Sequence, residues 1–406
     1  MRRGLPPELL VLLAGVTAAL HVGKLPPALP VLREALGVSL VQAGFLLSLV
    51  QLAGMSLGLL LGLMADGIGL RRSVLTGLVI LAAASALGGF AASPEALLAA
   101  RAAEGCGFLL ATLPAPSLIR RLVPGEHLSR RLGLWGAYMP SGTGLALLIG
   151  PWVLATGSWS LWWWGLALWT AAMAVWVACC VPPDPTHSPA AASTGWAIRL
   201  RQTLGSRGPW LVALAFAAYS SQWLAVIGFL PSIYAQAGLA GPIAGALTAL
   251  ASAANIVGNV GAGRLLWRGW PAPRLLAIGY LTMAAGALVA FGLPIGEGPG
   301  AAGLRYAAVL AFSAVGGLIP GALFSLAVQL APGEQTVSTT VGWVQQCSSL
   351  GQFAGPPLVA WVAAAVGSWQ WTWAVTGSCS LLGLGLAGAI AAALRRGQAP
   401  QRVSPA

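Results

Sequence analysis

Two pairs of charged or basic side chains interrupt the apolar segments of this sequence. His21 precedes Lys24 in the first apolar segment, and Arg101 precedes Glu104 in the fourth. Residues three apart share one face of a helix, so we expect each pair to act as a unit. A charge among apolar residues is costly unless it is paired or faces a cavity. Such groups therefore predict solute binding, proton transfer or a buried ion pair.

Lys24 is the chain's single lysine, and it lies far inside its apolar segment. About fifteen helical residues at about 1.5 Å each place it about 22 Å along the helix. A cation at the centre of a membrane costs about 2.5–3.5 kcal/mol, which makes it a candidate binding group. Pro26, Pro27 and Pro30 follow it and free nearby backbone carbonyls. Two interpretations remain open, namely that Lys24 binds a solute or that it reaches the outer head groups.

Arg101 and Glu104 also have two interpretations. In the first, they form a structural ion pair that ties their helix to its neighbours. In the second, Arg101 orders an outer cavity and Glu104 carries a proton, so that the pair couples transport to a proton gradient. The sequence alone leaves both open.

Further polar residues could complete a solute cavity. Gln222 lies 201 residues after His21, at the spacing by which the second half of the chain repeats the first, and Tyr219 lies one turn earlier. Each polar residue alone is more often a contact between helices than a ligand. The predicted substrate-binding set is Lys24, His21, Gln222, Tyr219, Tyr138 and Gln345.

The segments that position these residues are predicted to be membrane helices. Of the 406 residues, 57% are hydrophobic and 7% are charged, whereas about a quarter are charged in soluble domains. Apolar runs of about 20 residues cross a bilayer as helices. The sequence contains twelve such runs, at residues 9–31, 40–64, 74–92, 96–118, 132–155, 159–181, 209–232, 242–266, 275–294, 306–328, 338–363 and 372–394.

The formal net charge of +12 indicates orientation and not nucleic-acid binding. If the N-terminus is cytoplasmic, nearly all arginines outside the membrane fall in inside segments, and the outside loops hold only Arg33 and Arg305. Short cytoplasmic loops are enriched in Lys and Arg. We therefore predict that both termini are cytoplasmic.

The chain is predicted to consist of two related halves. Leu29-Pro30 recurs as Leu230-Pro231, and residues 157–159 recur as 367–369. A proline-rich and then arginine-rich segment separates the halves. The predicted division is an N-terminal six-helix bundle at 1–181, a cytoplasmic linker at 182–208 and a C-terminal six-helix bundle at 209–406.

Residues 62–72 join two apolar segments with turn glycines, one acid and two arginines, and a weaker copy spans residues 258–268. This loop resembles the signature between the second and third helices of the major facilitator superfamily. The resemblance implies twelve transmembrane helices in two pseudo-symmetric bundles, alternating access, and a central cavity lined by the first and seventh helices. Residues predicted to control the cytoplasmic side are Gly62, Asp66, Gly69, Arg71, Arg72, Arg264 and Arg268.

A narrower resemblance links the chain to the cyanate permease and nitroimidazole transporter branch. It is carried by residues 29–33, 116–121, 133–135 and 230–231. Members of that branch carry an arginine early in the first helix, where this chain has Ala19. That difference argues against cyanate itself and remains compatible with another small anion.

We therefore predict a secondary transporter that moves a small organic or inorganic anion. The alternative is proton-coupled export of hydrophobic drug-like compounds, for which Glu104 and the glycine-rich fifth span would matter most. A membrane sensor or scaffold is a third interpretation, which would need a signalling domain that the sequence does not contain.

The remaining expectations concern chemistry and location. No nucleotide-binding or metal-ligand motif is present, so we expect no enzymatic activity, cofactor or metal. The five cysteines lie in or beside apolar runs and predict no disulfide framework. Arginine-rich, alanine-rich and glycine-rich composition indicates a bacterial inner-membrane protein. We expect a monomer whose partners are a small solute, the lipid bilayer and protons as coupling ion.

Overall fold

The structure is a computed structural model that describes residues 5–124, 131, 134–184, 196–239, 241–296 and 298–398. The described residues form helices joined by turns and short loops, and they contain no β-strand. Within helices, the side chains of residues 61–68, 196, 335, 338, 397 and 398 are not described. The predicted gating residues Gly62 and Asp66 therefore lie outside the described side chains, although their backbone belongs to a helix.

Twelve helical segments of the described chain are long and apolar enough to cross a membrane, which confirms the predicted number of spans. They are Pro7–Leu36, Leu40–Leu60, Leu70–Gly88, Pro94–Leu122, Tyr138–Thr156, Trp159–Cys180, Arg207–Gln236, Gly241–Trp267, Ala272–Gly292, Pro299–Gln329, Thr339–Val366 and Trp369–Arg396. The first and seventh spans are several residues longer than their apolar runs. Helical structure continues there through prolines and polar residues at the span ends.

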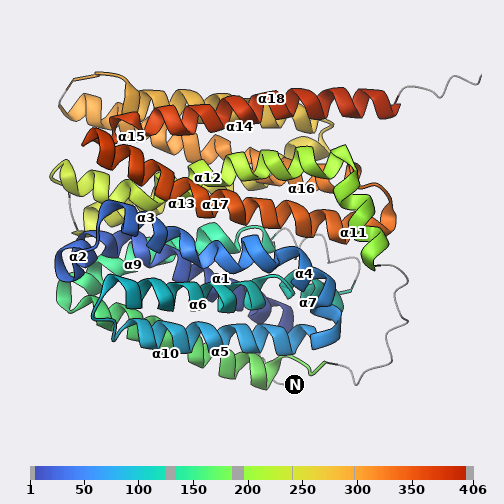
Figure 1. Cartoon of the computed structure of the whole chain (residues 1–406), viewed down its shortest axis with the longest axis horizontal. Helices are drawn as coiled ribbons and strands as arrows, with labels where there is room; N and C mark the ends of the chain where they lie inside the picture. The colour runs from blue at the N-terminus through green and yellow to red at the C-terminus, as the bar shows by residue number, and fades with distance from the viewer. Residues whose placement is uncertain are drawn as a thin grey trace, which may run out of the picture.

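The first six spans are built from ten helical elements, counting a short 3₁₀ turn. They are α1 (Pro7–Gly23), α2 (Leu25–Leu36), α3 (Leu40–Ser48), η1 (Leu49–Gln51), α4 (Leu52–Ile68), α5 (Leu70–Gly88), α6 (Pro94–Thr112), α7 (Ala115–Leu122), α9 (Tyr138–Thr156) and α10 (Trp159–Cys180). Figure 1 shows these helices as one layer, coloured blue to green.

The other six spans form the second layer, coloured yellow to red in Figure 1. They contain α12 (Arg207–Gln236), α13 (Gly241–Trp267), α14 (Ala272–Ala287), the π-helical η2 (Leu288–Gly292), α15 (Pro299–Gly316), α16 (Leu318–Gln329), η3 (Glu334–Thr336), α17 (Val337–Val366), η4 (Trp369–Trp371) and α18 (Thr372–Gln398). Helix α11 (Trp196–Gly205) lies between the layers in sequence, within the predicted linker. The division into two domains at residues 182–208 stays a prediction.

The arginine-rich ends of several helices gather at one end of the bundle. Helices α7 and α11 and the last turns of α18 all lie at the right-hand side of Figure 1, and we call this the arginine-rich end. Arg120 and Arg121 end α7, and Arg395 and Arg396 end α18. The opposite end holds α2 and α3. The side of the membrane that each end faces stays a prediction from the positive-inside rule.

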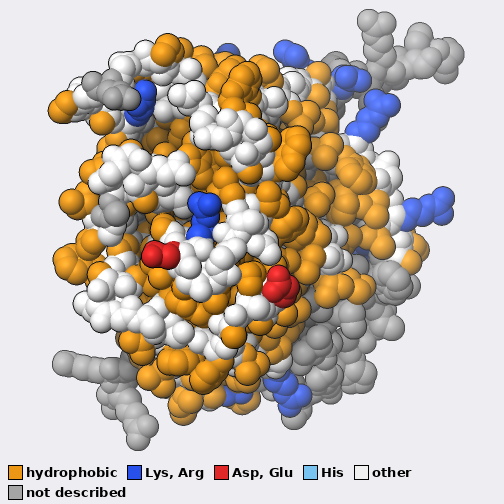
Figure 2. All heavy atoms as spheres, turned by 60° about the vertical axis from the view of Figure 1, so that its left-hand side comes forward, with side chains coloured by type: hydrophobic (Ala, Val, Ile, Leu, Met, Phe, Trp, Pro, Cys, Tyr) orange, Lys and Arg blue, Asp and Glu red, His pale blue; other side chains and the backbone are white. Residues whose placement is uncertain are grey.

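Apolar side chains cover much of the surface, as expected where lipid replaces water around a helix bundle. Figure 2 shows a face dominated by hydrophobic atoms, on which charged side chains are few and scattered. Exposed large hydrophobic residues include Leu168, Trp152 and Leu381, each more than 60% exposed. Four charged or basic side chains of the first six spans are buried instead, namely His21, Lys24, Arg101 and Glu104.

Candidate functional site

The first span is interrupted where its lysine lies. Helix α1 ends at Gly23, Lys24 forms the junction, and α2 begins with prolines in its first turn. Proline lacks the N–H that would bond to the preceding turn, so this junction is a local break in the hydrogen-bond ladder. The Lys24 carbonyl accepts a hydrogen bond from the indole Nε1 of Trp162 at 3.1 Å.

A close helix contact holds the junction in place. A Cβ added at Gly23 would lie 2.7 Å from the Cα of Thr143 on α9, which is closer than two carbon atoms approach without repulsion. Glycine therefore allows the backbones of α1 and α9 to touch. Helix α1 is fixed along one side, while the side chains of His21 and of Lys24 at the junction contact α5, α6 and α10.

The structure brings the two sequence-predicted pairs together into one ion cluster, which consists of His21, Lys24, Arg101 and Glu104. The Lys24 ammonium donates to one oxygen of Glu104, and the Arg101 guanidinium donates to the other oxygen at 2.6 Å. The four side chains are between 0% and 2% exposed. One carboxylate therefore lies between two cations inside the first six spans.

Further contacts orient each member of the ion cluster. Lys24 Nζ donates to Ser85 Oγ at 2.9 Å, and that hydroxyl donates to the Trp163 carbonyl at 3.0 Å. The ammonium also lies 4.7 Å from the centre of the Trp163 ring, a cation–π distance. Arg101 donates to two backbone carbonyls, those of Leu46 and His21.

His21 is held as a neutral imidazole by its hydrogen bonds. Lys24 has only donors, so His21 Nδ1, which lies 3.5 Å from Nζ, accepts. The other ring nitrogen, Nε2, then carries the hydrogen and donates to Thr170 Oγ1 at 2.8 Å, and Thr170 in turn donates to the Leu166 carbonyl. The ion cluster thus holds two positive charges and one negative charge.

The remaining predicted substrate residues lie elsewhere. Gln222 donates to the Ala218 carbonyl of its own helix and accepts from Ser380 of α18 at 2.9 Å. Tyr219 accepts from Asn255 of α13 at 2.9 Å. These partners belong to the last six spans, so the structure does not bring these two residues to Lys24.

Tyr138 and Gln345 are also separate from the ion cluster. Tyr138 begins α9 and stacks on Trp135 with ring centres 4.3 Å apart, and both rings lie against Gly15 of α1. Gln345 is half-buried on α17. The role of both residues in solute binding stays a prediction.

The loop that begins α5 is bound by an acid that sequence reasoning missed. The Asp184 carboxylate accepts from the backbone N–H groups of Arg71 and Arg72, both at 3.0 Å, and from the Arg121 guanidinium at 2.6 Å. Arg71 also donates from its side chain to the Ala178 carbonyl near the end of α10. We call Asp184, Arg71, Arg72 and Arg121 the Asp184 anchor. It joins the start of α5 to α7 and to the segment after α10.

Gly69 makes this anchor possible. Its φ of +94° lies where residues with a side chain are strained, and a Cβ there would lie 2.6 Å from an Asp184 carboxylate oxygen. Arg264 and Arg268, the counterparts in the repeat, are exposed at the end of α13.

Electrostatics at the Asp184 anchor favour the ionised acid. Burial raises the pKa of Asp184. Three hydrogen bonds lower it by more than that, namely those from the Arg71 backbone, the Arg121 side chain and the Arg72 backbone. The net effect is a pKa below the usual range of an aspartate. The carboxylate is therefore charged at neutral pH, at the N-terminus of a helix that attracts negative charge.

The two layers meet through side-chain amides. Gln346 of α17 donates to the Met55 carbonyl and accepts from the Leu59 N–H, both at 2.8 Å. These two groups of α4 are four residues apart and would normally pair within the helix. A side-chain amide is thus inserted into the ladder of α4. Nearby, Gln51 donates to Gln352 at 3.1 Å.

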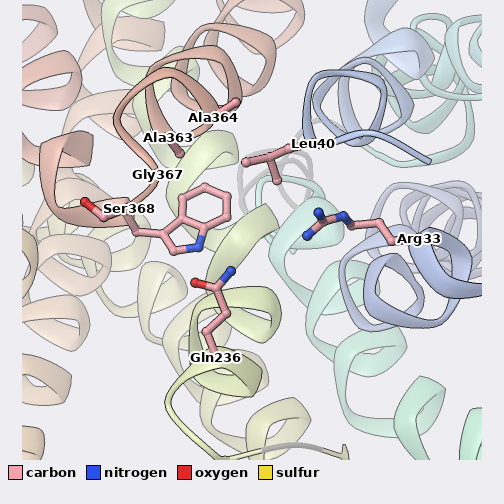
Figure 3. A pocket seen from close by; sticks show the side chains of 8 residues that line it. Arg33, Leu40, Gln236, Ala363, Ala364, Gly367 and Ser368 are labelled. Carbon is pink, nitrogen blue, oxygen red and sulfur yellow. The ribbon is translucent and has the colours of Figure 1, made fainter. Parts of the chain in front are cut away.

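A cavity of about 240 Å³ lies between the layers at the end opposite the arginine-rich end. Its walls include Arg33 of α2, Gln236 of α12 and Trp369 of η4. Figure 3 shows Arg33 and Gln236 pointing toward this space from different helices. Arg33 belongs to the first six spans and Gln236 to the last six, so the cavity depends on how the layers meet.

Comparison with known proteins identifies the family. Residues 11–340 match the family described as Major Facilitator Superfamily, which is more than half of the chain. The chain belongs to the major facilitator superfamily.

Solved structures of this superfamily share the fold. A bacterial homologue of the human lysosomal transporter Spinster, described as inward-facing and unoccupied, aligns with a TM-score of 0.71 at 17% identity and covers 99% of this chain and 100% of its own. Its inward-facing occupied form aligns at 0.73 and 16%, over 98% of both chains. A D-xylose–proton symporter aligns at 0.71 and 16%, over 94% of this chain and 96% of its own. At these identities the likeness establishes the fold.

One curated relative is similar over part of the chain. The puromycin resistance protein pur8 of Streptomyces alboniger is 36% identical over 146 residues, which are 35% of this chain and 27% of that protein. Together with the twelve spans, membership in the superfamily makes this protein a multi-pass membrane transporter and not an enzyme.

Proposed function

We propose that this chain is a secondary transporter that carries a small anion together with a proton by alternating access. The ion cluster of His21, Lys24, Arg101 and Glu104 is the observation that carries the proposal.

Charge balance links the two cargoes. Two cations and one carboxylate leave one excess positive charge in an apolar interior, where uncompensated charge is costly. An anion that enters neutralises this excess. It also makes protonation of Glu104 less costly, because the protonated ion cluster then carries one positive charge instead of two. Binding of the anion therefore favours binding of the proton, which couples the two cargoes.

The moving parts are the two six-helix bundles, residues 1–181 and 209–406, joined by the linker at 182–208. The ion cluster lies wholly within the first bundle, and the amide contacts of Gln51 and Gln346 lie between the bundles. Breaking and remaking contacts between bundles exposes a site to one side of the membrane at a time. The Asp184 anchor keeps the first bundle rigid while it moves.

The proposal extends to a narrower family and to a cellular location. We place the protein near the cyanate permease and nitroimidazole transporter branch, with a small anion other than cyanate as cargo, in the inner membrane of a bacterium with both termini cytoplasmic. The concentration of arginines at one end of the bundle supports the orientation.

The decisive experiment is anion uptake into proteoliposomes. We expect Lys24→Ala to abolish uptake, because Glu104 loses one of its two cations and the ion cluster loses its excess charge. Arg305→Ala, at a half-buried arginine outside the ion cluster, serves as the matched control and should transport normally. Normal uptake by a well-folded Lys24→Ala variant would contradict the proposal.

The partial similarity to pur8 favours a second candidate, proton-coupled export of hydrophobic compounds. In that case Glu104 exchanges a proton while the cargo binds elsewhere. Cells that express the chain should then tolerate puromycin better, and Glu104→Gln should remove this tolerance. Equal sensitivity of expressing and non-expressing cells argues against export.

A further inference from the structure

The hydrogen-bond donors of Lys24 are all in use. An ammonium group has three N–H donors, and Lys24 Nζ has three acceptors, namely Glu104, Ser85 Oγ at 2.9 Å and His21 Nδ1 at 3.5 Å. A new ligand of Lys24 would have to displace one of these partners. Lys24 is therefore a poor candidate for direct contact with an anion, although it contributes charge.

Arg101 is different, because part of its guanidinium is unused. A guanidinium has five N–H donors. Nε donates to the Leu46 carbonyl at 2.9 Å, and Nη1 donates to Glu104 at 2.6 Å and to the His21 carbonyl. Nη2 is buried, and it has no hydrogen-bond partner among the described residues. A buried donor without a partner has lost its hydrogen bonds to water without replacement, and this cost is larger when the group is charged.

The unused hydrogen-bond donors of Arg101 belong to the same ion cluster that carries one excess positive charge. Arg101 and Lys24 together exceed the charge of Glu104 by one, while the hydrogen bonds of His21 keep that imidazole neutral. One negative charge at Nη2 would neutralise the ion cluster and satisfy the free donors at the same time. No other member of the ion cluster combines positive charge with free donors.

We propose that Nη2 of Arg101 is the direct contact for a small monovalent anion, with Lys24 as the positioning residue that holds Glu104 on the other side. This inference rests on the proposed anion transport and names the group that binds the cargo. A guanidinium grips a larger oxyanion with two nitrogens through either its Nε–Nη2 edge or its Nη1–Nη2 edge, and here each edge has already committed one nitrogen, Nε to Leu46 and Nη1 to Glu104. The site therefore favours a small singly charged anion over a dianion.

Burial sets a condition on access. Arg101 is 2% exposed, and α6 packs closely on η1, since a Cβ added at Gly105 would lie 2.8 Å from the Val50 carbonyl oxygen. The anion reaches Nη2 only when α3, η1 or α6 shifts. The conformation described here is thus closed over this site, as alternating access requires of one state.

Binding to the purified protein tests the inference. Nitrite, formate and chloride are titrated in gluconate buffer by calorimetry, with sulfate as the dianion. We expect saturable binding of at least one monovalent anion and none of sulfate. Arg101→Lys keeps the positive charge but removes Nη2, so we expect at least tenfold weaker binding. Arg33→Lys changes an arginine that faces the cavity between the layers and should bind as the wild type does.

Two outcomes would overturn the inference. The first is wild-type affinity in Arg101→Lys, and the second is loss of binding in Arg33→Lys, which assigns the anion to the cavity between the layers. Should Arg101→Lys fail to fold, Glu104→Gln replaces it. That variant raises the excess charge, so an anion should raise its melting temperature more than that of the wild type. Equal increases in the melting temperature of Glu104→Gln and of the wild type would contradict the site.

Failure of this inference is distinguishable from failure of the proposed function. Binding that depends on Arg101, without anion flux in proteoliposomes, leaves the site standing and contradicts transport of that anion. Anion flux with unchanged affinity in Arg101→Lys leaves the transport function standing and contradicts this site.

Discussion

Glu104 is the residue on which the ion cluster depends, because it is the shared partner of two buried cations. Removing one partner of a buried ion pair leaves an uncompensated charge, which typically costs about 3–5 kcal/mol. Removing charges of both signs leaves the balance unchanged. Comparing the removal of one charge with the removal of two opposite charges therefore distinguishes charge compensation from simple loss of packing.

We therefore expect Glu104→Gln to lower the melting temperature of the purified protein strongly, by the equivalent of about 3–5 kcal/mol. Adding Lys24→Met to this variant restores the net charge of the wild type, because Arg101 alone remains charged. The double variant should then be more stable than Glu104→Gln. Additive losses in the double variant would show that charge balance does not stabilise the ion cluster.

Among individual residues, the sequence predicted the members of the ion cluster but not their arrangement. His21, Lys24, Arg101 and Glu104 are detectable because each is a costly group in an apolar run. Their common contact depends on how α1 and α6 are rotated, and residues 80 apart in sequence carry no signal of that. Ser85 and Thr170 are polar residues within apolar runs, and they mark the faces of α5 and α10 that complete the ion cluster.

Among the helices, the start of α5 shows how a turn and a distant acid act together. Gly69 provides the positive φ, and Asp184 accepts two backbone N–H groups that a helix N-terminus leaves without partners. The sequence singled out Asp66 as the acid of this loop, and its role stays a prediction because its side chain lies outside the described ones. Asp184 lies 113 residues from Arg71, beyond any local pattern, so its contact was not predictable.

Substitution at Gly69 tests this turn. Gly69→Ala places a Cβ against the Asp184 carboxylate and requires a φ that alanine disfavours, at a cost of about 1–3 kcal/mol. We expect a lower melting temperature and loss of the Arg121 contact. Gly263→Ala is the matched control, because it lies inside α13 with open space around it. An unchanged melting temperature in Gly69→Ala would contradict the strained turn.

The pH dependence of the Asp184 anchor follows from its lowered pKa. A carboxyl whose pKa is lower in the folded state contributes stability above its unfolded pKa of about 4, and that stability is lost as the pH falls through the folded value. Asp184→Asn should be about 1 kcal/mol less stable than the wild type at pH 7, the usual effect of losing a helix cap. Melting curves from pH 7 to pH 3 should show this difference shrinking below about pH 4. A constant difference would argue against an ionised Asp184.

For the molecule as a whole, the twelve spans were predictable because run length and apolar composition determine which segments cross a membrane. The contacts between layers were not, since they depend on single amides. Gln346 was one polar residue among several in the sequence, yet it inserts into the ladder of α4. Side-chain insertion is one of the recognised causes of a helix bend. This contact must open if the two bundles separate there.

A disulfide across this contact should stop transport. A Cβ added at Gly58 would lie 3.4 Å from the Cβ of Gln346, close to the spacing of a disulfide. Gly58→Cys with Gln346→Cys, in a background without the native cysteines, should cross-link on oxidation and lose anion uptake. A reductant should restore uptake, and each single variant should be insensitive to oxidant. Full uptake by the cross-linked protein would show that the layers do not separate at this contact.

Coupled transport is tested most directly by simultaneous measurement of anion and proton movement in proteoliposomes under an imposed pH gradient. We predict that the wild-type protein takes up a small monovalent anion and that one proton enters with each anion. We also predict that Glu104→Gln, if it retains anion flux, loses the dependence on the pH gradient. Anion uptake by the wild type without any accompanying proton movement would contradict the coupling role of the ion cluster.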